Sequence, residues 1–428
     1  MIHISRPIIR NEGEKYYLIS NIKDEKRDID SELWFSVDKE YGKYLCDDFA
    51  DSFLLGILPI AVKTGQDISV EGAVSEKLLY NILTGIEPAF QRIFSQKGRI
   101  GITTTEHKNI TYSNKGVATG CSLGVDSMSA IYRHLDYTNN GGGYKLTHLT
   151  LFNSGQLGDY DLEASEQNFL HTIEEIKPFA EKLGLPVLAI NGNLNFFYKD
   201  VGIVLTQTFP MRTVAFALAV QKLLGLYIMA SAIPVYRISF STIHADFQDA
   251  ALLPLMGTEN LTVYVGDPYV NRVEKTAYII KKPYVPQFLK VCWAEQTAFE
   301  VWHNTTFLEG KTKVNCGWCD KCLRTLLAIE VLQNGDLSGY ANQFELKKYY
   351  EHRNRFIRKI FRQQNKNIFY DELVNLILEK NYRNLPKGVL GFYKTKETLR
   401  KFGRFAKKCF GAVIHPRSIL GKLKRMLK

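Results

Sequence analysis

Strand-like and helix-like segments alternate along the middle of the chain. Short apolar runs such as THLTLFN (147–153) and LPVLAIN (185–191) have the length and composition of buried strands. Segments with apolar residues every three or four positions, such as EEIKPFAEKLG (174–184) and MRTVAFALAVQKLLG (211–225), are typical of helices. This alternation predicts an α/β fold for residues 115–335, with a parallel sheet between helices and ligands at the carboxyl ends of its strands.

The regions on either side of this block have different patterns. Residues 1–114 combine strand-like pieces with an apolar helical stretch at 44–65 and a helix over 74–94 for which Ser75 is a candidate N-cap. We therefore expect an α+β N-terminal region there. Residues 336–393 read as a helical extension, and no internal repeat is visible.

Composition narrows the class of protein. The 428 residues are 45% hydrophobic and 12% aromatic, which supports a large core and excludes a disordered or fibrous chain. No apolar run of about 18 residues or more occurs, and the first ten residues lack the blocks of a signal peptide. We therefore expect a cytoplasmic protein, which can also bind peripherally to the cytoplasmic face of the membrane.

The net charge of +11 is concentrated in a basic tail, residues 394–428, which hold 12 Lys and Arg and one Glu. On a helical wheel, the tail's apolar side chains fall on one face and its cations on the other, as in Leu399, Phe402, Phe405 and Phe410 against Arg400, Lys401, Arg404, Lys407 and Lys408. This pattern is typical of an interfacial helix on an anionic membrane. A nucleic-acid backbone is the rival partner, and a helix docked on the protein's own body is the third interpretation.

Three of the seven cysteines are crowded into NCGWCDKC, as Cys316, Cys319 and Cys322. Such crowding indicates a metal site in a reducing compartment and not a disulfide framework. A tetrahedral ion needs a fourth ligand, for which Cys292 is the nearest upstream candidate. We expect a closed four-cysteine Zn²⁺ site, and an iron–sulfur cluster is the alternative.

A candidate anion site lies where the strand-like residues 117–121 run through CSLGVDS into the helix-like MSAIYRHL. Helix N-termini attract anions because their first N–H groups are unpaired. Ser122 and Ser127 can contribute hydroxyls, Gly124 allows close backbone approach, and Asp126 can bind Mg²⁺. The segment matches neither a Walker A loop nor G-x-G-x-x-G, and an ordinary strand–helix turn remains the simpler interpretation.

The segment from Ser122 to Ser127 resembles the S-G-G-x-D-S signature of the PP-loop ATP pyrophosphatases, with Val125 at the variable position. The resemblance implies that these residues bind ATP, which is cleaved between its α- and β-phosphates. Leu123 departs from the signature because it replaces the first Gly. If this position requires a positive φ, a Leu there costs of order 1 kcal/mol, and its side chain can crowd the pyrophosphate.

The order of the turn, a single cysteine and the C-G-x-C-x-x-C knuckle is similar to that in the 7-cyano-7-deazaguanine synthase family. Within this resemblance, which covers about residues 115–329, Arg212 in FPMRT and Lys275 in RVEKTAYI match residues near ATP or substrate. Phe152 and Gln156 in FNSGQ match a strand end on which the nucleotide base rests. From the residues alone, Arg212 and Lys275 can also be solvated surface charges.

The resemblance implies an ATP-dependent ligase that adenylates a carboxylate or amide of a small-molecule or polymer-precursor substrate for C–N bond formation. Asp126, Arg212 and Lys275 would be its catalytic residues, and AMP and pyrophosphate its products. One alternative is a catalytically degenerate ATP-binding scaffold in a surface-polysaccharide or membrane-associated pathway. Another is a tRNA-modifying sulfur or nitrogen transferase, which needs a redox-active cysteine outside the metal site, and Cys121 is the nearby candidate.

Several features are left open by the sequence. His244 and Asp246, in STIHADFQD, follow a strand-like segment and are candidates to line the site or to be merely structural. The substrate, the nucleophile and the oligomeric state have no signature.

Overall fold

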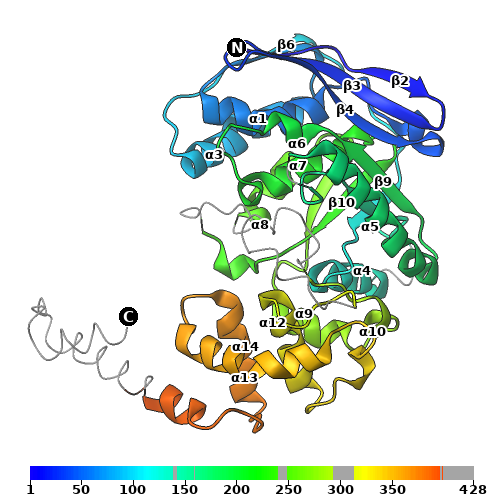
Figure 1. Cartoon of the computed structure of the whole chain (residues 1–428). Helices are drawn as coiled ribbons and strands as arrows, with labels where there is room; N and C mark the ends of the chain where they lie inside the picture. Colours follow the sequence, from blue (N-terminus) through cyan, green and yellow to red (C-terminus); the bar gives the residue numbers. More distant parts are fainter. Residues whose placement is uncertain (138–141, 159, 240–247, 293–312, 396–397, 399–428) are drawn as a thin grey trace, which may run out of the picture. The chain divides into compact units, whose positions relative to one another are not determined.

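The computed structural model describes residues 1–137, 142–158, 160–239, 248–292, 313–395 and 398. The chain divides into two compact units, Met1–Asn315 and Cys316–Lys428. The first unit contains a mixed, largely parallel sheet of 11 strands with helices packed around it (Figure 1). The α/β class predicted from the alternating pattern is therefore confirmed.

Five parallel strands of this sheet correspond to the alternating block. They are β7 (Gly116–Gly120), β8 (His148–Phe152), β9 (Val187–Gly192), β10 (Leu224–Ala230) and β11 (Thr262–Gly266). Their spatial order is β11-β10-β7-β8-β9, so the chain moves outward from β7 to β9 and then returns to the other side of β7. Ligands bind in such sheets where the strand order reverses, which here is the carboxyl end of β7 and β10.

The helices of this block mostly follow the sequence pattern. The longer ones are α4 (Val125–Tyr137), α5 (Leu162–Leu183), α7 (Leu205–Ala219) and α9 (Arg272–Ile279). Three single-turn helices accompany them, namely α6 (Leu194–Phe197), α8 (Asp249–Leu252) and α10 (Val285–Phe288).

The helix expected over residues 211–225 was wrong at its C-terminal end, because α7 ends at Ala219 and β10 begins at Leu224. The Leu223 carbonyl accepts a 2.9 Å hydrogen bond from the Gly116 N–H, next to the start of the pairing between β10 and β7. The periodicity of residues 220–225 favours a helix, but residues 220–223 form a turn, in which the Leu223 N–H donates to the Val220 carbonyl, and pairing in the sheet takes over from Leu224.

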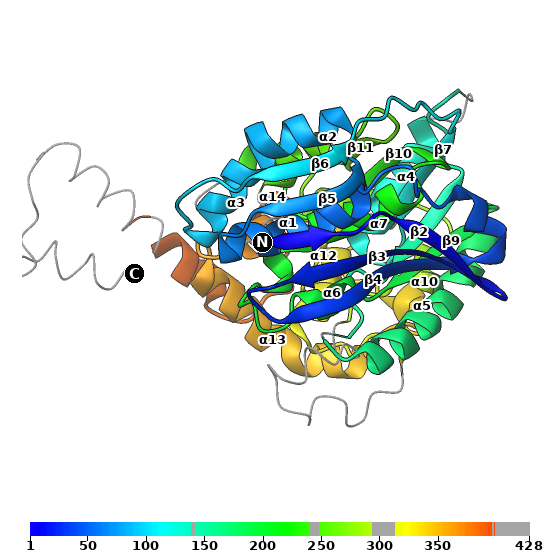
Figure 2. The ribbon, with the colours of Figure 1, turned by 90° about the horizontal axis from the view of Figure 1, so that it is seen from above.

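The N-terminal region extends the same sheet. Its strands are β1 (Ile2–Ile4), β2 (Ile8–Glu12), β3 (Lys15–Asp24), β4 (Ile29–Asp38), β5 (Ile68–Ala73) and β6 (Ile102–Glu106), several of which lie side by side in Figure 2. Antiparallel pairing of Phe35 with Gly192 joins β4 to β9. The outer edge of the parallel block is thus covered by the N-terminal region and not by solvent.

The helical segments of the N-terminal region are α1 (Asp51–Thr64), α2 (Glu76–Asn81), a π-helical turn (Ile82–Ile86) and α3 (Glu87–Phe94). The helix expected over 74–94 begins close to its predicted position, whereas the stretch expected over 44–65 was wrong at its start, because α1 begins seven residues later. Ser75 stands at the N-cap position of α2, but its hydroxyl donates to the buried carboxylate of Asp51 at 2.6 Å and makes no cap bond. Ser75 therefore ties the start of α2 to the start of α1.

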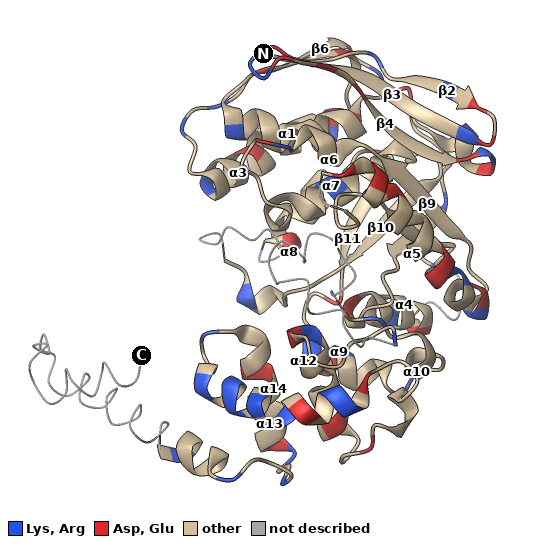
Figure 3. Cartoon of the chain, in the orientation of Figure 1, with Lys and Arg blue, Asp and Glu red and all other residues tan. Residues whose placement is uncertain are grey.

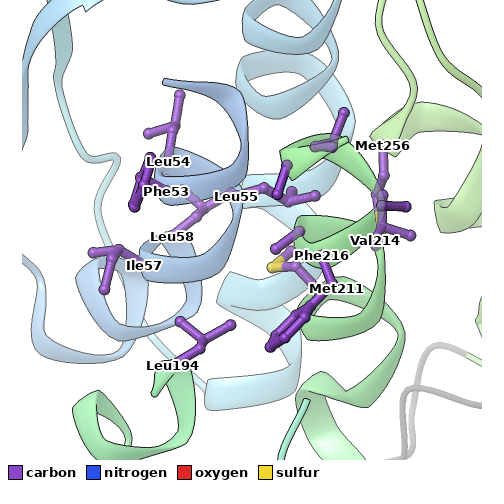
Figure 4. Packing of buried hydrophobic residues seen from close by; sticks show 14 of the residues in the cluster. Phe53, Leu54, Leu55, Ile57, Leu58, Leu194, Met211, Val214, Phe216 and Met256 are labelled. Carbon is purple, nitrogen blue, oxygen red and sulfur yellow. The ribbon is translucent and has the colours of Figure 1, made fainter. Parts of the chain in front are cut away.

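One hydrophobic core serves the N-terminal region and the parallel block together. Apolar side chains of α1 face those of α7 across this core (Figure 4). At its centre, the ring of Phe216 lies 4.9 Å from that of Phe35 on β4 and 5.9 Å from that of Phe152 on β8, between centroids. A single aromatic cluster therefore connects strands from both parts of the first unit.

The second unit is helical where the structure describes it. It contains α12 (Asp320–Leu332), a 3₁₀ turn (Ser338–Tyr340), α13 (Leu346–Gln363) and α14 (Ile368–Glu379). The buried carboxylate of Glu330 on α12 accepts a 2.7 Å hydrogen bond from Arg353 on α13 and a 2.5 Å bond from the hydroxyl of Tyr382. This carboxylate raises the pKa of Arg353 and keeps its guanidinium charged despite burial.

The basic tail, residues 394–428, lies outside the described residues except for positions 394, 395 and 398. In the part of the chain that the structure describes, no helix has both the length and the apolarity needed to cross a bilayer.

We predict that Phe216→Ala lowers the free energy of unfolding by about 3–5 kcal/mol, because it opens a cavity among buried rings. Urea denaturation followed by circular dichroism measures this change. Phe196→Ala removes the same group from a side chain that is 36% exposed, so it should cost less than about 1 kcal/mol. Equal losses in the two variants would contradict the central role of Phe216.

Candidate functional site

The predicted anion turn joins the strand and the helix as the sequence indicates. β7 ends at Gly120 and α4 begins at Val125, so residues 121–124 form the connection at the switch point of the sheet. The Ser127 hydroxyl donates to the Gly124 carbonyl at 3.1 Å and lies 3.1 Å from the Ser122 hydroxyl. These contacts place two hydroxyls at the helix N-terminus, where the first backbone N–H groups favour an anion.

Leu123, which replaces the first Gly of the PP-loop signature, has a φ of 57°. The position therefore has the left-handed conformation in which a Leu is strained. Its side chain is only 4% exposed, and its carbonyl accepts a 2.9 Å hydrogen bond from the Lys290 N–H. Burial of the side chain and this backbone hydrogen bond therefore hold Leu123 in a strained conformation.

Asp126, on the first turn of α4, faces two cations of α9. One carboxylate oxygen lies 3.5 Å from the Lys275 ammonium, and the other contacts the Arg272 guanidinium. Lys275 is 1% exposed, and its ammonium also donates to the carbonyl of Ser231, the residue that follows β10. The structure thus brings the predicted residues Asp126 and Lys275 together at the ends of β7 and β10.

The interpretation of Lys275 as a solvated helix residue was wrong, because the side chain is buried. It is buried because α9 packs against α4, and Lys275 lies on the side of α9 that faces the turn before α4.

Three residues of this cluster were missed by sequence reasoning. Arg272 precedes Lys275 by three positions, and that spacing places both on one helix face, a signal that was available in the sequence. Ser231 and Asp267 directly follow β10 and β11, and the Asp267 carboxylate accepts a 2.5 Å hydrogen bond from the Ser129 hydroxyl of α4. Their position after adjacent strands is the only signal that could have identified them.

Arg212 belongs to a second set of contacts, at the carboxyl end of β8. Its guanidinium donates to the Thr208 hydroxyl at 2.9 Å and to the Asn195 side-chain carbonyl, and it lies 3.5 Å from the ring centroid of Tyr198. A Cβ on Gly155 would approach its Nη1 to 3.0 Å. Since Arg212 is 1% exposed, its interpretation as a surface charge was wrong.

Phe152 and Gln156 lie at this same strand end, as predicted. The Phe152 ring is packed between those of Phe216 and Tyr227, so a base bound here would contact the backbone and not the ring. The Gln156 amide donates to the Phe152 carbonyl at 2.5 Å and accepts from the Ser154 hydroxyl at 2.9 Å. His244 and Asp246 lie outside the described residues.

The four predicted cysteine ligands form one cluster. The sulfur atoms of Cys292, Cys316, Cys319 and Cys322 all lie within 4.8 Å of one another, and all four side chains are buried. Zn–S bonds of about 2.3 Å in a tetrahedron require sulfur atoms about 3.8 Å apart, so the arrangement is compatible with Zn²⁺. Four thiolates complete the coordination of such an ion, which indicates a structural site.

Backbone groups hold the cysteine cluster in shape. The Cys319 N–H donates to the Cys316 sulfur at 3.3 Å, and the Cys322 N–H donates to the Cys319 sulfur at 3.4 Å. The Asn315 side-chain carbonyl accepts a 3.1 Å hydrogen bond from the Cys292 N–H and fixes the backbone at Cys292. Gly317 has a φ of 81°, and a Cβ there would approach the Glu345 carbonyl oxygen to 2.3 Å, so only glycine fits.

The reactivity of Cys121 bears on the sulfur-transfer alternative. Complete burial raises the pKa of the Cys121 thiol to about 12. The thiolate is the nucleophilic form, and it is scarce at neutral pH with such a pKa. Cys121 therefore gives that alternative no support.

No protein-family model matches the chain, and no match emerged from comparison with curated proteins or with solved structures. The resemblance to PP-loop proteins consequently rests on the motifs quoted above.

We predict that the purified protein contains about one zinc ion per chain and that Cys292→Ser lowers this content severalfold, because it removes one of four thiolate ligands. Inductively coupled plasma mass spectrometry measures zinc and iron together. Cys121→Ser alters a buried cysteine outside the cluster and should retain the metal. Iron in place of zinc, or full zinc content in Cys292→Ser, would contradict the assignment.

Strain at Leu123 can be measured with two substitutions. Both Leu123→Ala and Leu123→Gly lose most of the buried side chain and should destabilise the fold, by about 1–3 kcal/mol. Only Gly relieves the left-handed conformation, so Leu123→Gly should be more stable than Leu123→Ala by about 1 kcal/mol in urea unfolding. An Ala variant at least as stable as the Gly variant would show that the position carries no strain.

Proposed function

We propose that the protein is a PP-loop type, ATP-dependent ligase that adenylates a carboxylate or amide of a small-molecule or polymer-precursor substrate. The observation that carries the proposal is the meeting of Asp126 and Lys275 at the switch point of the parallel sheet, beside a helix N-terminus. Cations that can contact phosphate and a carboxylate that can bind a metal ion meet there, which suits a nucleoside triphosphate better than a neutral ligand.

The phosphates of ATP would occupy the turn before α4. The hydroxyls of Ser122 and Ser127 and the helix N-terminus would donate to phosphate oxygens, and Arg272 and Lys275 would offset their charge. Asp126 offers oxygen atoms of the kind that Mg²⁺ binds. A bound Mg²⁺ would screen the negative charge on the leaving pyrophosphate.

The proposed reaction has two steps, adenylation of the substrate and formation of the C–N bond. An oxygen of the substrate carboxylate attacks the α-phosphorus, so that an O–P bond forms and the bond to the β-phosphate breaks. Pyrophosphate leaves, and a nitrogen nucleophile such as ammonia next attacks the activated carbonyl carbon, forms the C–N bond, gives up one proton to water and displaces AMP. The protein contributes mainly position and electrostatic stabilisation to both steps.

Arg212 has a positioning role in this proposal. Its guanidinium packs beneath Gly155 and holds Asn195, so it fixes the end of β8 next to the turn at the end of β7. Its positive charge also favours an anionic substrate group at that strand end.

The conformation of Leu123 favours a second candidate function, a scaffold that binds ATP without turning it over. A Leu held at positive φ in the phosphate turn costs free energy and occupies the position of a glycine in the PP-loop signature. Binding of ATP without formation of AMP is what this candidate predicts.

The ligase is tested by incubating the protein with ATP, Mg²⁺, ammonium and a panel of carboxylic acids, and by separating AMP from ADP chromatographically. We expect AMP and pyrophosphate in equal amounts, and a decrease of at least about 100-fold in Asp126→Asn, because the variant loses the carboxylate that would bind Mg²⁺ beside the leaving pyrophosphate.

Asp136→Asn is the matched control, since it makes the same change at the exposed end of α4 and should leave the rate unchanged. ADP and phosphate without AMP would refute the adenylating ligase. Bound ATP in calorimetry, with no AMP from any acid of the panel, would support the scaffold instead.

A further inference from the structure

Charge is strongly segregated between the two units of the chain. Residues 1–315 hold 30 Lys and Arg against 35 Asp and Glu, whereas residues 316–428 hold 25 Lys and Arg against 9 Asp and Glu. The tail accounts for only part of this excess, because residues 316–393 alone have 13 basic and 8 acidic side chains. A folded part of the second unit must therefore present cations of its own.

Most of these cations lie on α13. At about 100° per residue, its exposed or half-buried cations fall within an arc of roughly 120° that runs the length of the helix, namely Lys347, Lys348, Arg355, Arg358, Lys359 and Arg362. The blue segments of α13 in Figure 3 show this concentration. The opposite side of the helix packs into the unit through buried residues that include Tyr349, Phe356 and Ile360.

Acidic neighbours neutralise this basic face only in part. Lys348 lies 3.5 Å from Glu351, and Lys359 lies 3.0 Å from Asp320. Lys347, Arg355 and Arg358 are exposed and make no ion pair with any residue that the structure describes. An exposed row of like charges is unfavourable in isolation, so it calls for an anionic partner.

We propose that the basic face of α13 docks the protein on an anionic phospholipid surface, independently of the function proposed for the first unit. A row of cations over about 20 Å matches an extended array of lipid headgroups, and each cation near such a surface contributes roughly a fivefold gain in affinity.

The amino-acid sequence after α14 favours the lipid over a nucleic acid. The tail at the end of the second unit has an expected apolar face with Leu399, Phe402, Phe405 and Phe410. Such a face suits the acyl boundary of a membrane and has no counterpart in a phosphate backbone.

The test uses the full chain and sedimentation with vesicles of phosphatidylcholine alone or with 30% phosphatidylserine, at about 0.1 M and 0.5 M salt. We expect binding only to the anionic vesicles and mainly at low salt. Reversal of the three unpaired cations, in Lys347→Glu/Arg355→Glu/Arg358→Glu, should weaken that binding by roughly 100-fold.

A matched control reverses three exposed lysines of the first unit, in Lys23→Glu/Lys97→Glu/Lys199→Glu, and changes the net charge by the same amount. This control should bind at least tenfold more tightly than the α13 variant. Circular dichroism and thermal unfolding establish that both variants are folded.

Three results would overturn the proposal. The first is binding by the α13 variant as tight as that of the control, which would assign any membrane contact to the tail alone. The second is binding to neutral and anionic vesicles alike. The third is tight binding of single-stranded RNA that is lost in the α13 variant while vesicle binding is absent, which would make the surface a nucleic-acid interface.

Discussion

The ammonium group of Lys275 is almost completely buried, and a buried charge is tolerated only with partners close by. Its partners are the Asp126 carboxylate, at the start of α4, and the Ser231 carbonyl, at the end of β10. These two groups are neighbours because β7 and β10 pair at the point where the strand order reverses. The same pairing therefore positions the candidate anion turn and provides the partners of the buried Lys275 charge beside it.

The N-terminal region contributes to this arrangement through the core and the sheet. β4 pairs with β9 and removes an exposed edge from the parallel block, and the rings of Phe35, Phe216 and Phe152 interlock behind the strands. Movement of β8 relative to β7 would disturb this packing. The carboxyl ends of the strands, where Arg212 and Asp126 lie, are thus attached to a rigid base.

The second unit differs from the first in where its charges lie. Its interior contains a paired carboxylate and guanidinium, Glu330 and Arg353, and its exposed helix face is rich in cations. Because the paired charges cancel inside and the remaining cations are outside, the unit combines a stable helical core with a strongly positive surface. The candidate site residues Asp126, Arg212 and Lys275 and the cation-rich surface are consequently found in different parts of the chain.

Local features could be read from the sequence by itself. The strand, turn and helix around Asp126, the C-x2-C-x2-C knuckle with Cys292 and the helices of residues 346–380 depend on spacing and short-range geometry, which the sequence contains. Only the tertiary structure decided the burial of Arg212 and Lys275, the inclusion of Arg272 and Ser231, and the end of α7 at Ala219. These properties follow from strand order and from which helices pack together, and contacts between different elements, up to 149 positions apart for Lys275 and Asp126, leave no periodic trace in the chain.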